Sequence, residues 1–165
     1  MSISSTEDPG TPGYELPLLL LAGFRAVIDE AHAELAVRGH PELRPGHAFA
    51  LQAVGTFGAT AADVGRRLGI SKQAAGKTID RLAELGYLTR AEPGPDRRRK
   101  LVTLTARGTE ALTLSAEAFT RIRGRWAAEL GPGRVAALEK DLRAMTPGQP
   151  LRLDFPGWLG TAPGG

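Results

Sequence analysis

A run of basic side chains, Arg97, Arg98, Arg99 and Lys100, lies in a segment rich in proline and glycine. A guanidinium group is a planar fork of donors that can hold two oxygens of a phosphate at once. Asp96 stands two positions before Arg98, where its carboxylate can orient that fork. Arg98 therefore suits a narrow, strongly negative groove of a polyanion, and the other three suit phosphate.

A second group of polar side chains follows Ser71, which is a good residue for beginning a helix. In a helix from residue 72, the outward positions are Lys72, Gln73, Ala74, Gly76 and Lys77. A glutamine amide can make two hydrogen bonds to adenine, alanine can touch a thymine methyl group, and lysine can reach bases or phosphates. Many exposed helix starts carry such side chains, so this pattern alone also fits a solvated helix.

Charge is unevenly distributed along the chain, whose net charge is only +3. Residues 60–107 contain eleven Lys or Arg against five Asp or Glu, whereas the rest contains ten against thirteen. A basic middle segment between acidic flanks is typical of a module that meets a polyanion, although charge alone fits a solvated face equally well.

The residues that could read a polyanion fall on two short helices. Thr60 and Asp63 have the spacing of a capping box, so a helix should begin there and end at Gly69. The next helix should run from Ser71 to about Leu85, and only Gly69 and Ile70 separate the two. This arrangement predicts a helix-turn-helix, whose inward residues are Val64, Leu68, Ala75, Ile79, Leu82 and Leu85.

The basic run falls in the loop of a predicted hairpin. Residues 88–91 and 101–104 are strand-like and enclose the Pro/Gly-rich residues 92–100, which gives a wing beside the helix-turn-helix. Thr105 should cap a long helix to about residue 130. The apolar positions of that helix at helical spacing are Leu112, Ala116, Phe119, Ile122 and Trp126.

Three further helices are predicted outside the winged segment. One spans residues 16–38, one spans 45–54 with Pro45 in its first turn, and one follows the breaker at 131–133. The apolar stripes of the first helix and of the last two, which include the long helix to about residue 130, exceed what a small winged domain can cover and therefore predict a homodimer. The stripes are Leu20, Phe24, Val27, Ile28, Ala31 and Leu35 in the first helix and Val135, Leu138, Leu142 and Met145 in the last.

Residues 58–108 resemble the winged helix-turn-helix of the MarR family. The matching pieces, in order, are Thr60-Asp63-Val64, Leu68-Gly69-Ile70-Ser71, Ile79-Asp80-Arg81-Leu82, Gly86-Tyr87-Arg90, Asp96-x-Arg98 and Leu104-Thr105-Gly108. The resemblance implies a mainly α fold with a small β-hairpin wing and terminal dimerisation helices. It also implies a transcriptional regulator on double-stranded DNA, with a pseudo-palindromic operator and Asp96 holding Arg98. Two glycines, Gly65 and Gly76, depart from the residues usual in the family, so we expect them to serve close packing or close approach to DNA.

The expected division of the chain is a flexible tail at 1–13, N-terminal helices at 14–56, the DNA-binding domain at 57–108, dimerisation helices at 109–145 and a Pro/Gly-rich tail at 146–165. The expected DNA-binding set is Thr60, Ser71, Lys72, Gln73, Ala74, Gly76, Lys77, Arg81, Arg90, Asp96, Arg97, Arg98, Arg99 and Lys100. In this family ligands bind between the dimerisation helices and the winged domain, so the candidate lining residues are Phe24, His47, Phe49 and Trp126. We expect a cytoplasmic repressor released by a small ligand such as an aromatic compound; a constitutive or architectural DNA-binding protein is the alternative.

Several classes of protein fit the sequence poorly. The chain has no cysteine, and the spacing of His32, His40 and His47 is not that of metal ligands, so neither a metal nor another cofactor is expected. Phosphate loops, nucleophile elbows and HExxH motifs are absent from the sequence, which argues against an enzyme. The apolar run at 16–22 is too short to cross a bilayer.

Overall fold

The computed structural model describes residues 10–92, 95 and 100–148. These residues form a mainly helical fold with one two-stranded antiparallel hairpin, as the sequence predicts. The elements are α1 (Glu15–Val37), α2 (Pro45–Val54), α3 (Ala61–Leu68), α4 (Lys72–Glu84), β1 (Leu88–Arg90), β2 (Val102–Leu104), α5 (Ala106–Leu130) and α6 (Arg134–Met145).

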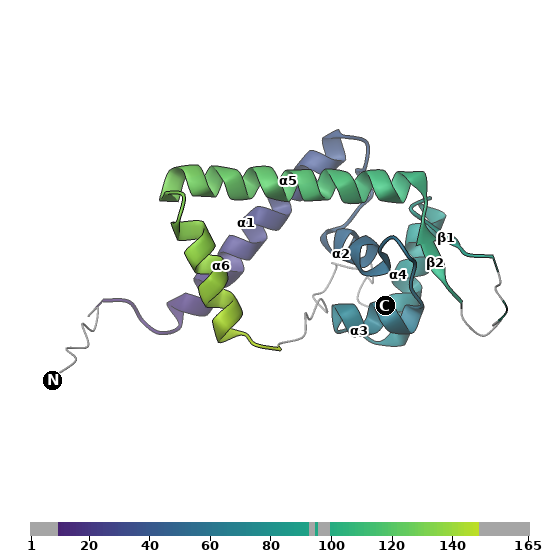
Figure 1. Cartoon of the computed structure of the whole chain (residues 1–165), viewed down its shortest axis with the longest axis horizontal. Helices are drawn as coiled ribbons and strands as arrows, with labels where there is room; N and C mark the ends of the chain where they lie inside the picture. Colours follow the sequence, from purple (N-terminus) through teal and green to yellow (C-terminus); the bar gives the residue numbers. More distant parts are fainter. Residues whose placement is uncertain (1–9, 93–94, 96–99, 149–165) are drawn as a thin grey trace, which may run out of the picture.

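Helix α5 runs along the whole molecule and joins its two ends (Figure 1). Helices α1 and α6 pack on its C-terminal half, and α2 packs on its N-terminal half. Arg125 makes a two-pronged ion pair with Glu30 of α1, at 2.6 and 2.5 Å. Arg123 does the same with Glu139 of α6, at 2.6 and 3.0 Å. These exposed pairs fix the alignment of the helices more than they add to stability.

Local capping explains where the helix-turn-helix begins and turns. The hydroxyl of Thr60 accepts a hydrogen bond from the Asp63 N–H at 3.2 Å, and that of Ser71 accepts one from the Ala74 N–H at 3.0 Å. Gly69 ends α3 in the left-handed region, with φ of 66°, which glycine adopts without strain. The predicted inward residues Val64, Leu68, Ala75, Ile79 and Leu82 are buried in the core, and Leu85 is half-buried.

The hairpin is anchored to the helix-turn-helix by a third stretch of backbone. Leu88 pairs with Leu104 and Arg90 with Val102, and Val102 also forms an isolated bridge with Ala59, just before α3. The backbone of Ala59 and Val102 exchanges two hydrogen bonds of 3.0 Å. The base of the wing is therefore fixed relative to both helices of the motif.

Three segments that are distant in sequence meet at Tyr87, whose side chain is fully buried. Its hydroxyl lies 2.9 Å from Nδ1 of His40, in the loop between α1 and α2, and Arg107 of α5 lies over its ring at 4.8 Å from the centroid. Its carbonyl accepts a hydrogen bond from the Thr105 N–H at 3.1 Å. A Cβ on Gly108 would come within 2.1 Å of that carbonyl oxygen, so α5 approaches Tyr87 as closely as glycine allows.

The apolar stripes predicted on the long helices are only partly covered within the single chain. Leu20 is 44% exposed, and on α5 Ala116 is exposed while Leu114, Ser115 and Ala118 are buried. The reason is that α1, α5 and α6 extend beyond the winged half, so periodicity marks apolar faces without showing what covers them. Helix α6 buries only Val135; Leu138, Leu142 and Met145 are 42%, 38% and 80% exposed.

We predict that Gly108→Ala strongly destabilises the fold, because the new Cβ would overlap the Tyr87 carbonyl and push α5 away from the junction. The free energy of unfolding, measured by urea denaturation, should fall by about 1–3 kcal/mol or more. Gly124→Ala in the same helix is the matched control, since nothing lies within 4 Å of the added Cβ. It should stabilise by about 0.5–1 kcal/mol, and equal effects of the two changes would contradict the role given to this contact.

Candidate nucleic-acid interface

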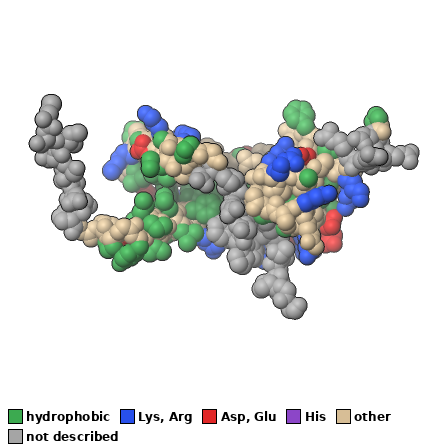
Figure 2. Space-filling view, turned by 90° about the horizontal axis from the view of Figure 1, so that it is seen from below, with side chains coloured by type: hydrophobic (Ala, Val, Ile, Leu, Met, Phe, Trp, Pro, Cys, Tyr) green, Lys and Arg blue, Asp and Glu red, His purple; other side chains and the backbone are tan. Residues whose placement is uncertain are grey.

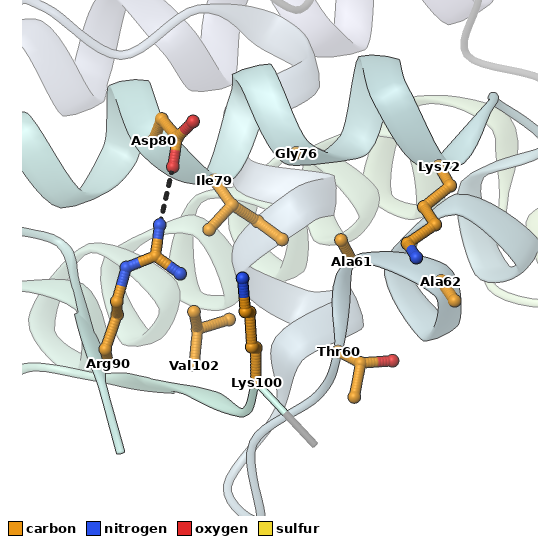
Figure 3. Close-up of a pocket in the computed structure, with 10 residues that line it drawn as sticks. All are labelled: Thr60, Ala61, Ala62, Lys72, Gly76, Ile79, Asp80, Arg90, Lys100 and Val102. Carbon is orange, nitrogen blue, oxygen red and sulfur yellow. Dashed lines mark hydrogen bonds and ion pairs between the residues drawn. The ribbon is translucent and has the colours of Figure 1, made fainter. Parts of the chain in front are cut away.

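A cleft of about 520 Å³ opens between the start of α3, one face of α4 and the base of the wing. Three cationic side chains border it: Lys72 from α4, and Arg90 and Lys100 from the two arms of the hairpin (Figure 3). Thr60 lies at one edge, and Ile79 and Val102 form an apolar floor. Such a cleft offers separate donors for an extended anion above an apolar base.

Helix α4 divides its polar residues between two faces. Lys72, Gly76 and Asp80 follow one another at intervals of four and line the cleft. Gln73 and Lys77, one position further on, are exposed next to that face. Since a helix turns by about 100° per residue, the two rows point in adjacent directions. One row therefore faces the wing, while the other is free to contact a partner directly.

Arg90 is held over the cleft by Asp80, whose carboxylate it contacts at 2.9 Å (Figure 3). The side chains of Arg90 and Asp80 are 62% and 61% exposed, so this ion pair contributes little to stability. Its effect is positional, because it links α4 to the first strand of the wing. Sequence reasoning gave Asp80 no role, although its spacing of eight residues from Lys72 could have placed it on this face.

The capping box at the start of α3 fixes Thr60 at the edge of the cleft. The backbone N–H of Thr60 donates to the Asp63 carboxylate at 2.9 Å, and its hydroxyl donates to the same oxygen at 2.8 Å. Together with Arg66, which also contacts this carboxylate, these bonds lower the pKa of Asp63 from 3.8 to about 2. The carboxylate is therefore ionised at all physiological pH values.

The two unusual glycines have different surroundings. A Cβ on Gly65 would lie 3.0 Å from the Ile70 carbonyl oxygen, so this glycine permits the close packing of α3 against the turn, as expected. At Gly76 nothing lies within 4 Å of the corresponding position. Gly76 thus leaves open space on the cleft wall. The expectation that DNA approaches closely at this position stays a prediction.

Of the expected DNA-binding set, Thr60, Lys72, Gly76, Arg90 and Lys100 line the cleft. Ser71 caps α4, Ala74 is half-buried, and Arg81 pairs with Glu84 at 3.2 Å. Asp96, Arg97, Arg98 and Arg99 lie outside the described residues, as do most of the two predicted tails.

The four candidate ligand residues do not meet in one place. Phe49 lines a cavity between α2 and α5, whereas Trp126 lines a crevice between α1, α5 and α6. His47 is buried in the first turn of α2, where its Nδ1 accepts the Arg44 N–H at 3.0 Å. Phe24 packs against the main core. Sequence reasoning treated aromatic residues on these helices as one group and did not consider Gln52, Leu112, Ser115 and Phe119 together, which the structure brings around the cavity with Phe49.

In the described part of the chain, no group of histidine, aspartate or glutamate side chains is arranged so that it could hold a metal ion, and this includes the three histidines. Burial is the main cause that lowers the pKa values of His32 and His40, which favours their neutral forms. Within the same residues, no helix is long and apolar enough to cross a membrane.

The helix-turn-helix, the hairpin fixed beside it and the cationic cleft between them define a winged helix-turn-helix protein. The sequence model of the MarR family matches residues 43–99, which include the helix-turn-helix and most of the wing. The chain therefore carries a MarR-family winged helix-turn-helix, and its overall fold is that of MarR-family transcriptional regulators.

Solved structures support the fold over most of the chain. RV1404 from Mycobacterium tuberculosis is similar at 20% identity and a TM-score of 0.67, covering 85% of this chain and 96% of its own. MarR from E. coli, without ligand, is similar at 20% identity and a TM-score of 0.63, covering 84% and 98%. A MarR-family regulator from Rhodococcus sp. RHA1 has 18% identity and a TM-score of 0.62, covering 82% and 96%. No curated protein matches the chain.

We predict that the capping box makes stability fall in acid. Because the pKa of Asp63 is lowered on folding, its contribution is complete above pH 4 and is lost as the pH falls towards 2. Urea midpoints measured between pH 5 and pH 2 should therefore fall less for Asp63→Asn than for the wild type. Thr60→Ala keeps the backbone donor and removes the hydroxyl donor, so its urea midpoint should decrease by an amount between those of the wild type and Asp63→Asn. Identical pH profiles for all three proteins would contradict this account.

Proposed function

We propose that this protein is a sequence-specific transcriptional regulator that binds double-stranded DNA as a homodimer. The observation that carries the proposal is the cationic cleft between α4 and the wing, next to the exposed row of Gln73 and Lys77. A major groove accepts a helix, and its base edges distinguish all four base pairs. The proposed activity is binding alone, without a catalytic step.

In the proposed complex, Gln73, Ala74 and Lys77 of α4 face the major groove. The wing reaches the neighbouring minor groove with Arg98, oriented by Asp96, while Arg97 and Arg99 meet phosphates. The sugar-phosphate strand between the two grooves passes over the cleft, where Lys72, Arg90 and Lys100 offer positive charge. Thr60, Ser71, Gly76 and Arg81 complete the proposed contact set.

The proposed dimer forms through the end of the molecule made by α1 and α6. Figure 2 shows hydrophobic side chains gathered at that end. Leu16, Leu18 and Leu19 of α1 are 64%, 58% and 61% exposed, and Met145 of α6 is 80% exposed. Contiguous apolar surface of this kind is typical of an interface. A twofold dimer presents two α4 helices to half-sites about one helical turn apart on a pseudo-palindromic operator.

We further propose that residues 14–56 and 109–145 form the dimerisation and ligand-binding part, and that residues 57–108 form the DNA-binding part. The protein would act in the cytoplasm as a repressor that a small ligand releases from DNA. Two observations support this. Helix α2 packs against both α3 and α5, and an open cavity lies between α2 and α5. A ligand bound there would touch α2, whose contact with α3 joins the two parts.

Binding to duplex DNA tests the proposal. An operator selected from random duplexes should bind with an affinity that falls steeply with salt, by a logarithmic slope of about 0.9 for each phosphate neutralised. Gln73→Ala should cost about 1–3 kcal/mol on that operator and little on random duplex. Lys100→Ala, the matched change at the cleft, should weaken binding to both duplexes alike and reduce the logarithmic slope by about 0.9, the value for one lost phosphate contact. Salt-independent binding, or no binding, would overturn the proposal.

The oligomeric state provides a separate prediction. Light scattering at micromolar concentration should give twice the 17.4 kDa mass of one chain. Leu18→Glu should produce monomers, because it places a charge in the proposed apolar interface. Val37→Glu is the control, since Val37 is also exposed on α1, at 85%, but lies at the opposite end of the helix. A dimer that is lost equally in both variants would contradict this interface.

A further inference from the structure

The cavity between α2 and α5 has a volume of about 250 Å³, which is below the roughly 300 Å³ at which ligand pockets usually begin and therefore suits only a small ring compound. Phe49 and Gln52 of α2 face it from one side, and Leu112, Ser115 and Phe119 of α5 face it from the other. Helix α2 also packs on α3, so one wall of the cavity is connected directly to the helix-turn-helix.

Every described side chain that lines this cavity is uncharged. Arginines on nearby turns of α5 point elsewhere and are already paired: Arg121 contacts Glu34, and Arg123 contacts Glu139 at 2.6 Å. A carboxylate that entered this open cavity would lose part of its bound water without gaining a cation as partner. Such a transfer is costly, so the lining selects against anionic ligands.

Two polar groups in the lining define what a ligand can offer. The Ser115 hydroxyl already donates to the Ala111 carbonyl at 2.8 Å, so towards the cavity it can only accept a hydrogen bond. The Gln52 side chain is exposed at the rim, and its amide can both donate and accept. One hydroxyl or amide group on an otherwise apolar ring would satisfy this pair.

We propose that this cavity binds an uncharged, mainly apolar ring compound with one hydroxyl or amide group, and that it discriminates against aromatic carboxylates of the same size. The proposal rests on the proposed function, in which a small ligand controls the regulator. Phe119 adds a route for that control, because it lines both this cavity and the crevice between α1, α5 and α6. A ligand in the cavity that shifts Phe119 would therefore also shift a side chain that lines the crevice.

The test compares matched neutral and anionic probes on the full-length protein without DNA, by calorimetry and thermal shift at pH 7.5. The pairs are 2-naphthol with 2-naphthoate and 4-hydroxybenzamide with 4-hydroxybenzoate. We expect the neutral member of at least one pair to raise the melting temperature and to bind at least about tenfold more tightly than its anion. Equal or tighter binding of the carboxylates, or no binding of any probe, would overturn the proposal.

Three variants locate the site. Ala116→Leu adds volume at an exposed wall position and should abolish binding of the neutral probe. Gln52→Arg should shift the preference towards the carboxylate by about tenfold, because it supplies the missing cation at the rim. Thr113→Arg adds the same charge on an exposed position of α5 outside the lining and should leave the preference unchanged. Unchanged binding in Ala116→Leu, or the same shift in both arginine variants, would overturn the assignment.

Binding of the neutral probe is measured separately from its effect on DNA affinity. If the probe binds this cavity and DNA affinity stays the same, the inferred ligand chemistry stands and the proposed release mechanism fails. If the operator never binds while the probe does, the proposed function fails and the inferred chemistry again stands.

Discussion

The contact between Tyr87 and the start of α5 holds the two halves of the molecule in one arrangement. Tyr87 lies between α4 and the first strand of the wing. Its hydroxyl reaches His40 before α2, and its carbonyl accepts a hydrogen bond from the Thr105 N–H where α5 starts. The absence of a side chain at Gly108 lets α5 approach that carbonyl. Because the hydroxyl of Tyr87 is buried, breaking its hydrogen bond would leave a polar group without water, so the junction resists small displacements.

This junction gives the cleft and the long helices a common frame. The wing is fixed at its base by Ala59 and Val102, and Asp80 links it to α4 through Arg90. The cations around the cleft therefore have a set relation to the exposed row of α4, which contact with two neighbouring grooves requires. Helix α2 touches both α3 and α5 and so connects this winged part to the long helix.

The cavity and the crevice show how one helix can serve two purposes. Helix α5 presents small residues and Phe119 to α2, and apolar residues such as Ile122 and Trp126 to α1 and α6. Its ion pairs with both flanking helices hold Arg123 and Arg125 at the surface, away from the cavity between α2 and α5. The cavity between α2 and α5 thus has an uncharged lining in a chain in which 24% of the residues are charged, whereas Arg123 and Glu139 border the crevice.

The sequence by itself determined the elements of the winged segment, because their signals are local. Thr60, Ser71 and Thr105 mark helix starts through their own hydrogen bonds, Gly69 marks a turn through its left-handed backbone, and periodic apolar residues mark the inward faces. Tertiary structure alone decided which side chains meet. It paired Asp80 with Arg90, brought Tyr87 to His40 and separated Phe49 from Trp126, which the family resemblance had grouped together. Helical spacing fixes the face on which a residue lies, whereas its neighbour depends on how distant segments pack.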